Sequence, residues 1–331
     1  MHSFTKEEQR RAGEQNYTIL CIDDESVNLK VLASIFKDHY NIVVCKSAKQ
    51  GFQLALHESP DIILLDVLMP EENGFELMEK LKQHPKLTDI PVIFITGLQD
   101  AEDEEKGLMM GACDYIQKPF NHGIVRARVN THLEIVRQRN LLQKFALFDS
   151  LTELPNRRKW QQDSVDYWLS SKNAQSPMVY GIIDVDHFKK YNDHYGHQQG
   201  DVVLRKIANI VRRTLFEFGG AIFRCGGEEF YFYFPASQQC DAESKLATCL
   251  KSVEQLAIPH HAISAISAIS ASSHVSISIG AIQVIPDEKN SVEQVMQQAD
   301  ERLYIVKNST RNAVSYLNLN VDEQQISLDI S

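Results

Sequence analysis

Two adjacent carboxylates, Glu228 and Glu229, follow a pair of glycines in the stretch 224–230, which reads RCGGEEF. Apolar runs at 221–223 and 230–234 flank the glycines. This pattern predicts a tight hairpin, because glycine takes positive φ without a Cβ clash. Adjacent acids at a chain reversal repel each other, so a fold that keeps them together usually offsets their charge with a cation. Taken alone, the stretch also fits a solvated acidic turn.

A second pair of acids follows the apolar run 178–183. Side chains alternate along a strand, so Asp184 and Asp186 are expected to point to the same face. Together with Glu228 and Glu229 they would form an oxygen-rich cradle of the kind that suits Mg²⁺. Such a cluster favours a metal site over a simple acidic turn.

Polar residues also end the strand-like runs in the first half of the chain. We expect strands at 18–22, 42–45, 62–65, 92–95 and 114–116, with amphipathic helices between them. Strands that alternate with helices predict a parallel sheet covered on both faces, and such sheets bind ligands at the carboxyl ends of their strands. The residues at those ends are Asp23, Asp24, Asp66, Thr96 and Lys118. Three carboxylates, a hydroxyl and an ammonium group would therefore meet in one pocket.

The composition limits the classes of function. A chain of 331 residues, 43% of them hydrophobic, can bury the cores of about two domains. Its formal net charge of -10, without a concentrated basic tract, argues against nucleic acid or an anionic membrane as a partner. The six cysteines contain no Cys-x-x-Cys pair, which disfavours a zinc site or a disulfide framework. No apolar run reaches membrane-spanning length, and we expect a cytoplasmic protein.

The first pocket resembles that of the receiver domain of two-component response regulators. The match rests on Asp23-Asp24, Asp66-Val67-Leu68-Met69-Pro70, Thr96 and Lys118-Pro119-Phe120, and it covers about 17–135. The resemblance implies a flavodoxin-like α/β fold with a five-stranded parallel sheet. It also implies that a partner histidine kinase phosphorylates Asp66.

Roles within this pocket follow from the same resemblance. Mg²⁺ would be held by Asp23, Asp24, Asp66 and the carbonyl of Leu68, and the phosphoryl oxygens would be bound by Thr96 and Lys118. The peptide bond between Lys118 and Pro119 is expected to be cis. Tyr115 matches the aromatic residue that reorients on activation, although a half-buried strand tyrosine is an equally good account.

A long helix is predicted at 124–148, a stretch without proline or glycine. Its apolar stripe comprises Val125, Val129, Leu133 and Val136 and resumes at Leu141, Leu142 and Phe145. The stripe would either pair with a second copy as a short coiled coil or pack on its own domain, and pairing is favoured for the later half. Helix register would give a charge change at Asp66 a route to the second half of the chain.

The second half resembles the GGDEF domain of diguanylate cyclases. The resemblance rests on the opening stretch 149–158, the acids and glycines described above, and the strand-like run 275–282. It implies an α+β, palm-like nucleotidyl cyclase domain over 149–317, joined to the receiver by the helix. Such a domain would condense two GTP molecules into cyclic di-GMP and two pyrophosphates across a homodimer.

Site roles again come from the resemblance. Mg²⁺ would be bound by Asp184, the carbonyl of Val185 and Glu228, with Glu229 as a base or second metal ligand. Phosphates would be bound by Lys189, the backbone N–H groups near His187 and Phe188, and the pair Lys307 and Arg311. Guanine would be read by Asn192 and Asp201, because a carboxylate can accept from N1–H and N2–H of guanine, whereas adenine has no N1–H.

Two stretches depart from the family pattern. Many cyclases carry an Arg-x-x-Asp site of product inhibition just before the hairpin, and Glu217 and Gly220 occupy those positions here. An acid cannot bind phosphate as arginine does, so we expect no inhibitory product site. Ala-Ile-Ser occurs three times over 262–270, a period that fits neither helix nor strand. We expect an inserted loop without a catalytic role.

Two other functions stay open at this point. The second half could be a catalytically silent module that binds GTP or cyclic di-GMP, or the chain could be a scaffold whose receiver recruits partners. Silent relatives usually lose acids of the hairpin or strand, and all are present here, which favours the enzyme. The remaining segments, 1–16 and 318–331, are expected to be a polar and an acidic tail.

Overall fold

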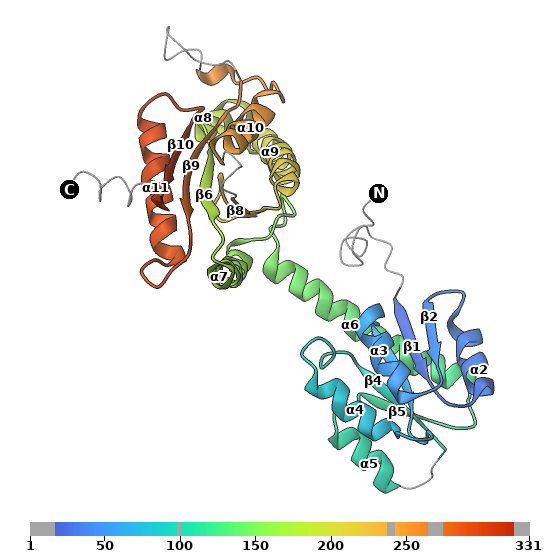
Figure 1. The fold of residues 1–331 in the computed structure, drawn as a ribbon. Helices are drawn as coiled ribbons and strands as arrows, with labels where there is room; N and C mark the ends of the chain where they lie inside the picture. The colour runs from blue at the N-terminus through green and yellow to red at the C-terminus, as the bar shows by residue number, and fades with distance from the viewer. Residues whose placement is uncertain (1–16, 98–100, 237–241, 264–273, 321–331) are drawn as a thin grey trace. The chain divides into compact units, whose positions relative to one another are not determined.

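The computed structural model describes residues 17–97, 101–236, 242–263 and 274–320. The chain divides into two compact units, 1–142 and 143–331, and the boundary falls inside one helix, α6 (His122–Leu147). Figure 1 shows the elements of each unit.

A five-stranded parallel sheet forms the centre of the N-terminal unit, in the order β2-β1-β3-β4-β5. The strands are β1 (Thr18–Ile22), β2 (Asn41–Cys45), β3 (Ile62–Asp66), β4 (Val92–Thr96) and β5 (Asp114–Gln117). β1, β3 and β4 are buried along their whole length, which explains their continuous apolar runs. The predicted sheet is confirmed, with every strand within one residue of its expected start.

Alternation along these strands divides the core into two layers. One layer lies between the sheet and the helices α3 (Ala48–Glu58) and α4 (Gly74–Gln83). The other lies between the sheet and the helices α2 (Ser26–Phe36) and α6. A further helix, α5 (Ala101–Met109), precedes β5. The chain order reverses between β1 and β3, and this is where a parallel sheet opens a crevice at its carboxyl edge.

Helix α6 has an apolar stripe whose first half is used within the N-terminal unit. Val125, Val129 and Leu133 belong to the core layer that also contains α2, and Val136 is buried. The first half of the stripe therefore packs on its own domain rather than on a second copy. Leu142 and Phe145, in the later half, are 69% and 72% exposed.

A second five-stranded sheet lies in the C-terminal unit, in the order β10-β9-β6-β8-β7. The strands are β6 (Met178–Val185), β7 (Ala221–Arg224), β8 (Glu229–Pro235), β9 (Ile277–Val284) and β10 (Val314–Asn318). β6 is central and antiparallel to both β8 and β9, whereas β10 is parallel to β9. The sequence did not indicate β10, because residues 314–318 show no clear alternation of apolar and polar side chains. The structure leaves all five of these residues only partly buried.

Helices cover both faces of this sheet. The helices of the C-terminal unit are α7 (Arg157–Ala174), α8 (Phe188–Tyr195), α9 (His197–Glu217), α10 (Ala242–Glu254) and α11 (Val292–Asn308). One apolar cluster joins the sheet to α8, α9 and α10, and another joins it to α7 and α11. The expected α+β organisation is confirmed. No helix among the described residues combines the length and apolar character that a membrane crossing needs.

One close contact in this unit leads to a stability prediction. Gly280 lies in the middle of β9, and a Cβ there would collide with the backbone of Ala299 and Leu303 on α11. We expect Gly280→Ala to lower the free energy of unfolding of the C-terminal unit by about 1–3 kcal/mol, because the helix must move off the sheet. Trp160 and Trp168 are the two tryptophans of the chain, so their fluorescence during denaturant unfolding reports on this unit.

Gly227→Ala is the matched control, because a Cβ at that position has no neighbour within 4 Å. Equal unfolding midpoints for the two variants would show that the helix is not held this closely against β9.

Candidate functional site

Three acids of the N-terminal unit meet at the carboxyl edge of its sheet. Asp23 and Asp24 follow β1, Asp66 ends β3, and oxygen atoms of the three carboxylates lie within 4.8 Å of one another. The ammonium group of Lys118 lies 2.9 Å from Asp23 and 2.8 Å from Asp66. Burial raises the pKa of Asp66, although the hydrogen bond from Lys118 opposes this shift. One cation against three anions in an oxygen-rich site fits a divalent metal ion such as Mg²⁺.

The other predicted residues of this pocket border the same edge. The peptide bond between Lys118 and Pro119 is cis, as expected. Leu68 lies two residues beyond β3 with an exposed side chain. Thr96 is buried at the end of β4.

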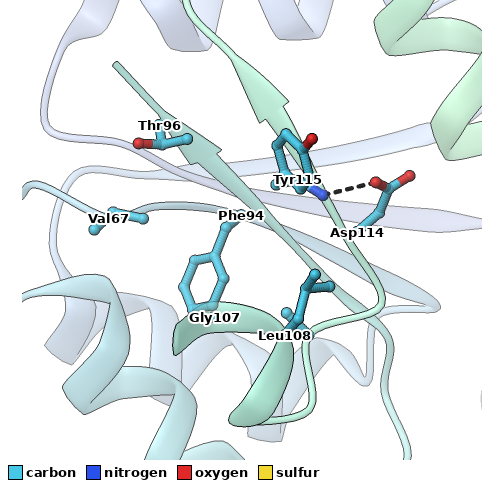
Figure 2. A pocket seen from close by; sticks show the side chains of 8 residues that line it. Val67, Phe94, Thr96, Gly107, Leu108, Asp114 and Tyr115 are labelled. Atoms are coloured by element: carbon cyan, nitrogen blue, oxygen red, sulfur yellow. Dashed lines mark hydrogen bonds between the residues drawn. The ribbon is translucent and has the colours of Figure 1, made fainter. Parts of the chain in front are cut away.

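Tyr115 and Thr96 border a small cavity of about 10 Å³ (Figure 2). The backbone N–H of Tyr115 donates to the carboxylate of Asp114. The guanidinium of Arg128, on α6, pairs with Asp114 and lies 5.3 Å from the centre of the Tyr115 ring. A cavity of this size holds about one water molecule, so the ring cannot turn into it unless its neighbours move. Tyr115 therefore contacts the helix that continues into the C-terminal unit.

The acids of the C-terminal unit gather where β6 ends and β8 begins. Asp184 lies opposite Glu229 in the antiparallel ladder, and the backbone N–H of Val185 donates to the carbonyl of Glu228. Asp184 is buried, and the ammonium group of Lys307 on α11 lies 2.8 Å from its carboxylate. A predicted metal ligand and a predicted phosphate-binding cation thus belong to one cluster.

Charge is only partly balanced in this cluster. Burial raises the pKa of Asp184 to about 6, and repulsion from Glu228 and Glu229 adds to the shift although Lys307 opposes it. Burial and Glu229 also raise the pKa of Glu228. A raised pKa means that the surroundings disfavour the charged carboxylate. A hard divalent cation with oxygen ligands would relieve this cost, so the residues fit Mg²⁺.

The predicted phosphate-binding residues surround the turn that follows β6. The backbone of His187 adopts the left-handed conformation, with φ of 55°. Helix α8 begins at the next residue, and no side chain caps its start. Burial and the positive charge of Arg311 lower the pKa of His187. Arg311 precedes Asn312, whose backbone N–H donates to Asp186 beside this turn. Phe188 is buried in the core and Lys189 is exposed. The uncapped helix start and the nearby cations suit an anion.

Asn192 and Asp201 are brought together by a glycine. A Cβ at Gly200 would collide with the carboxamide of Asn192, so only glycine lets this side chain approach the start of α9 beside the exposed Asp201. The carboxamide oxygen of Asn192 is buried and has no hydrogen-bond partner among the residues that the structure describes. An orphaned acceptor beside a carboxylate suits a ligand that brings N–H groups, as guanine does.

Comparison with known families identifies both units. The family model described as "Diguanylate cyclase, GGDEF domain" matches residues 146–313, about half of the chain. The chain belongs to the GGDEF family. The model of the response regulator receiver domain matches residues 19–130, so the N-terminal unit is a receiver domain.

Curated relatives share one or both domains. Response regulator PleD of Caulobacter vibrioides is 26% identical over 306 residues, which cover 89% of this chain and 65% of PleD. Diguanylate cyclase VdcA of Vibrio cholerae is 36% identical over 185 residues, which cover 55% of this chain and 51% of VdcA. The chain thus spans about half to two thirds of the length of these relatives.

A solved structure also resembles part of the chain. It contains the coiled coil and GGDEF domain of DgcB from Caulobacter crescentus in complex with c-di-GMP. It is 26% identical, with a TM-score of 0.49, and covers 58% of this chain and 99% of that one.

The GGDEF hairpin differs from its prediction in one respect. Neither Gly226 nor Gly227 has positive φ. A Cβ at Gly226 would lie 2.8 Å from a carboxylate oxygen at the flexible end of Glu229, and a Cβ at Gly227 would have no neighbour within 4 Å. Positive φ is therefore not the reason for either glycine.

Arg224 holds the tip of the GGDEF hairpin, a role that sequence reasoning missed. Its guanidinium donates to the carbonyl of Gly227 at 2.7 Å and pairs with Asp149 at 2.8 Å. Asp149 also accepts from the backbone and hydroxyl of Thr152. The first turn of the GGDEF domain is therefore bonded directly to the hairpin. An open cavity of about 450 Å³ lies beside them.

The prediction that four acids share one cradle is wrong for Asp186, because its carboxylate binds other groups of the protein. Its carboxylate accepts from the hydroxyls of Ser276 and Ser278 at 2.7 Å and 2.6 Å, and from the backbone N–H of Asn312 at 3.0 Å. Asp186 lies one residue beyond β6, where strand alternation no longer applies. It anchors β9 and the segment that carries Arg311.

Two stretches of the sequence depart from the family pattern, and the structure describes the first in full and the second only in part. Glu217 is exposed at the end of α9. A Cβ at Gly220 would lie 2.6 Å from the carbonyl of Tyr233, so this backbone has no room for a side chain there. Of the Ala-Ile-Ser repeat at 262–270, the part beyond Ile263 lies outside the described residues.

The contrast between Asp184 and Asp186 gives a prediction. Asp186→Asn should lower the free energy of unfolding of the GGDEF domain by about 1–3 kcal/mol, because the three hydrogen bonds to its carboxylate lose their charge assistance and an amide nitrogen cannot accept one. Asp184→Asn should leave stability equal or higher, because it removes a carboxylate whose charge the fold disfavours. Only Asp184→Asn should weaken binding of Mn²⁺, followed by electron paramagnetic resonance.

The titration is made in an Asp24→Asn background, so that the receiver pocket does not contribute. Equal loss of Mn²⁺ affinity in both variants would contradict the separate roles of these two acids.

Proposed function

We propose that the chain is a diguanylate cyclase that condenses two GTP molecules into cyclic di-GMP and two pyrophosphates, under the control of its receiver domain. The observation that carries the proposal is the cluster of Asp184, Glu228, Glu229 and Lys307 at the end of β6 and the start of β8. The negative charge of these carboxylates is only partly balanced, which suits a divalent cation. Lys307, which would also bind phosphate, lies beside them. The orphaned carboxamide of Asn192 beside Asp201 supports guanine as the base.

In the proposed reaction each 3′-hydroxyl oxygen bonds to the α-phosphorus of the other GTP, and the bond from that phosphorus to pyrophosphate breaks. Asp184, Glu228 and the carbonyl of Val185 would hold Mg²⁺, which when bound lowers the pKa of the hydroxyl and offsets charge at the α-phosphate. Glu229 would accept the hydroxyl proton or serve as a second metal ligand. Lys189, Lys307, Arg311 and the N–H groups of the 187–188 turn neutralise and orient the phosphates.

Each GGDEF domain holds one GTP and supplies half of the product, so the proposal requires a homodimer. The exposed Leu142 and Phe145 support α6 as one contact between the copies, because large apolar side chains on a helix favour burial.

Control is proposed to begin with transfer of a phosphoryl group to Asp66 from a histidine kinase. Asp23, Asp24, Asp66 and the carbonyl of Leu68 would hold Mg²⁺ there, while Lys118 and Thr96 bind the phosphoryl oxygens. The contact between Tyr115 and Arg128 links this pocket to α6. A change in that contact would alter how α6 pairs, and so the dimer.

A cyclase assay tests the activity. Purified chain with GTP and Mg²⁺ should form cyclic di-GMP and two equivalents of pyrophosphate, and beryllofluoride should change the rate. Glu228→Gln should lower the rate by about 100-fold or more, because loss of a metal ligand removes several kcal/mol of transition-state stabilisation. Asp66→Asn should abolish the response to beryllofluoride. A wild-type chain that makes no product in either state, and equals Glu228→Gln, is not a cyclase.

Product inhibition gives a separate prediction. Low micromolar cyclic di-GMP should leave the initial rate unchanged, because Glu217 repels phosphate and Gly220 has no room for a ligand side chain. The rate is measured against added cyclic di-GMP for the wild type and Glu217→Ala, which should behave alike. Dose-dependent inhibition in this range would contradict the loss of the product site.

A further inference from the structure

The turn at His187 lies at the start of α8, where the proposed function places the phosphates of GTP. A left-handed backbone is uncommon for a residue other than glycine, so the surrounding structure must hold this turn. The peptide unit between His187 and Phe188 is planar, with its C=O and N–H pointing in opposite directions. Whatever fixes the carbonyl oxygen of His187 therefore also aims the N–H of Phe188, a predicted phosphate donor.

A second histidine contacts this carbonyl. His260 is fully buried, and its Nε2 lies 3.3 Å from the carbonyl oxygen of His187. The same oxygen also accepts the first hydrogen bond of α8, from the backbone N–H of Tyr191 at 3.1 Å. A carbonyl can only accept, so the contact requires a hydrogen on Nε2 of His260. Burial lowers the pKa of His260, which is consistent with a neutral ring in this tautomer.

The segment around His260 is held on both sides of the contact. The backbone N–H of Val275 donates to the carbonyl of Ile258 at 2.8 Å, and the N–H of His261 donates to the hydroxyl of Tyr195 at 3.0 Å. The His260 ring meets the Tyr191 ring edge-on, with 5.1 Å between their centres. The segment that carries His260 is therefore bonded to Val275, just before β9, and to Tyr195 of α8. These bonds hold Nε2 of His260 against the carbonyl of His187.

We propose that His260 is a positioning residue for the phosphates of GTP. By donating from Nε2 to the carbonyl of His187, it holds the turn in the conformation that aims the N–H of Phe188 at the β- and γ-phosphates. The proposal rests on the proposed function, and it adds a residue more than 70 positions away from the turn that it fixes. His260 itself does not touch the substrate.

Three substitutions at one position separate hydrogen bonding from packing. His260→Phe keeps a ring against Tyr191 but has no donor. His260→Gln keeps a donor that can reach the carbonyl of His187. His260→Asn also has a donor, but its side chain is too short to reach that carbonyl. Tyr195→Phe is the matched control, because it removes a hydrogen bond of the same segment without touching His187.

The probe is guanosine 5′-[α,β-methylene]triphosphate with Mg²⁺, measured by isothermal titration calorimetry, with GMP as the ligand that lacks the outer phosphates. His260→Phe and His260→Asn should bind the triphosphate about tenfold more weakly and GMP within twofold of wild type. His260→Gln and Tyr195→Phe should bind both ligands within threefold of wild type. In the cyclase assay, KM for GTP should rise in the first two variants more than kcat falls.

The outcomes distinguish this proposal from the proposed function. A wild-type chain that does not bind the triphosphate overturns both. Wild-type binding with an unchanged affinity in His260→Phe, or an equal loss for GMP and triphosphate, overturns the positioning role alone. Should His260→Phe fail to fold in a thermal melt, the comparison of Gln with Asn decides, and equal affinities in these two variants reject the proposal.

Discussion

The gathering of three carboxylates at the partly buried end of one strand is the constraint around which the GGDEF domain is arranged. Asp184, Glu228 and Glu229 are held together by the pairing of β6 with β8, and burial, with added repulsion from the two glutamates, raises the pKa of Asp184. The scaffold bears the cost of this burial because β6 is the buried central strand of its sheet, fixed on both edges. The receiver follows the same principle, since Asp23, Asp24 and Asp66 lie together and the ammonium group of Lys118 pairs with only Asp23 and Asp66.

The sequence predicts most of what is local. Apolar runs located the central strands of both sheets, and strand ends located the receiver acids. Contacts between residues that lie far apart in the chain could not be predicted. Asp186 looked equivalent to Asp184 because the two alternate, and only the folded chain brings Ser276 and Ser278 to its carboxylate. The same limit applies to Arg224 and Asp149, and to His260 and His187. Residue type indicates possible chemistry, whereas the sheet order determines which groups meet.

Periodicity has a related limit in α6. The stripe of Val125, Val129 and Leu133 shows that one face of the helix is apolar but not what covers it. The structure buries this half in the receiver core and leaves Leu142 and Phe145 exposed. One helix therefore serves two purposes along its length. Its first turns complete a domain, and its last turns present an apolar surface beyond that domain.

The anchoring of the hairpin tip has a consequence for sequence drift. Arg224 holds the tip through the carbonyl of Gly227, a group that every amino acid possesses, and its carboxylate partner is Asp149, which lies outside the hairpin. An exchange of glutamate for aspartate at 228 would thus leave the anchor intact while shortening the reach of the carboxylate. Support and chemistry at this turn can change independently, so a lineage could alter these carboxylates, or lose them, and still inherit a folded domain.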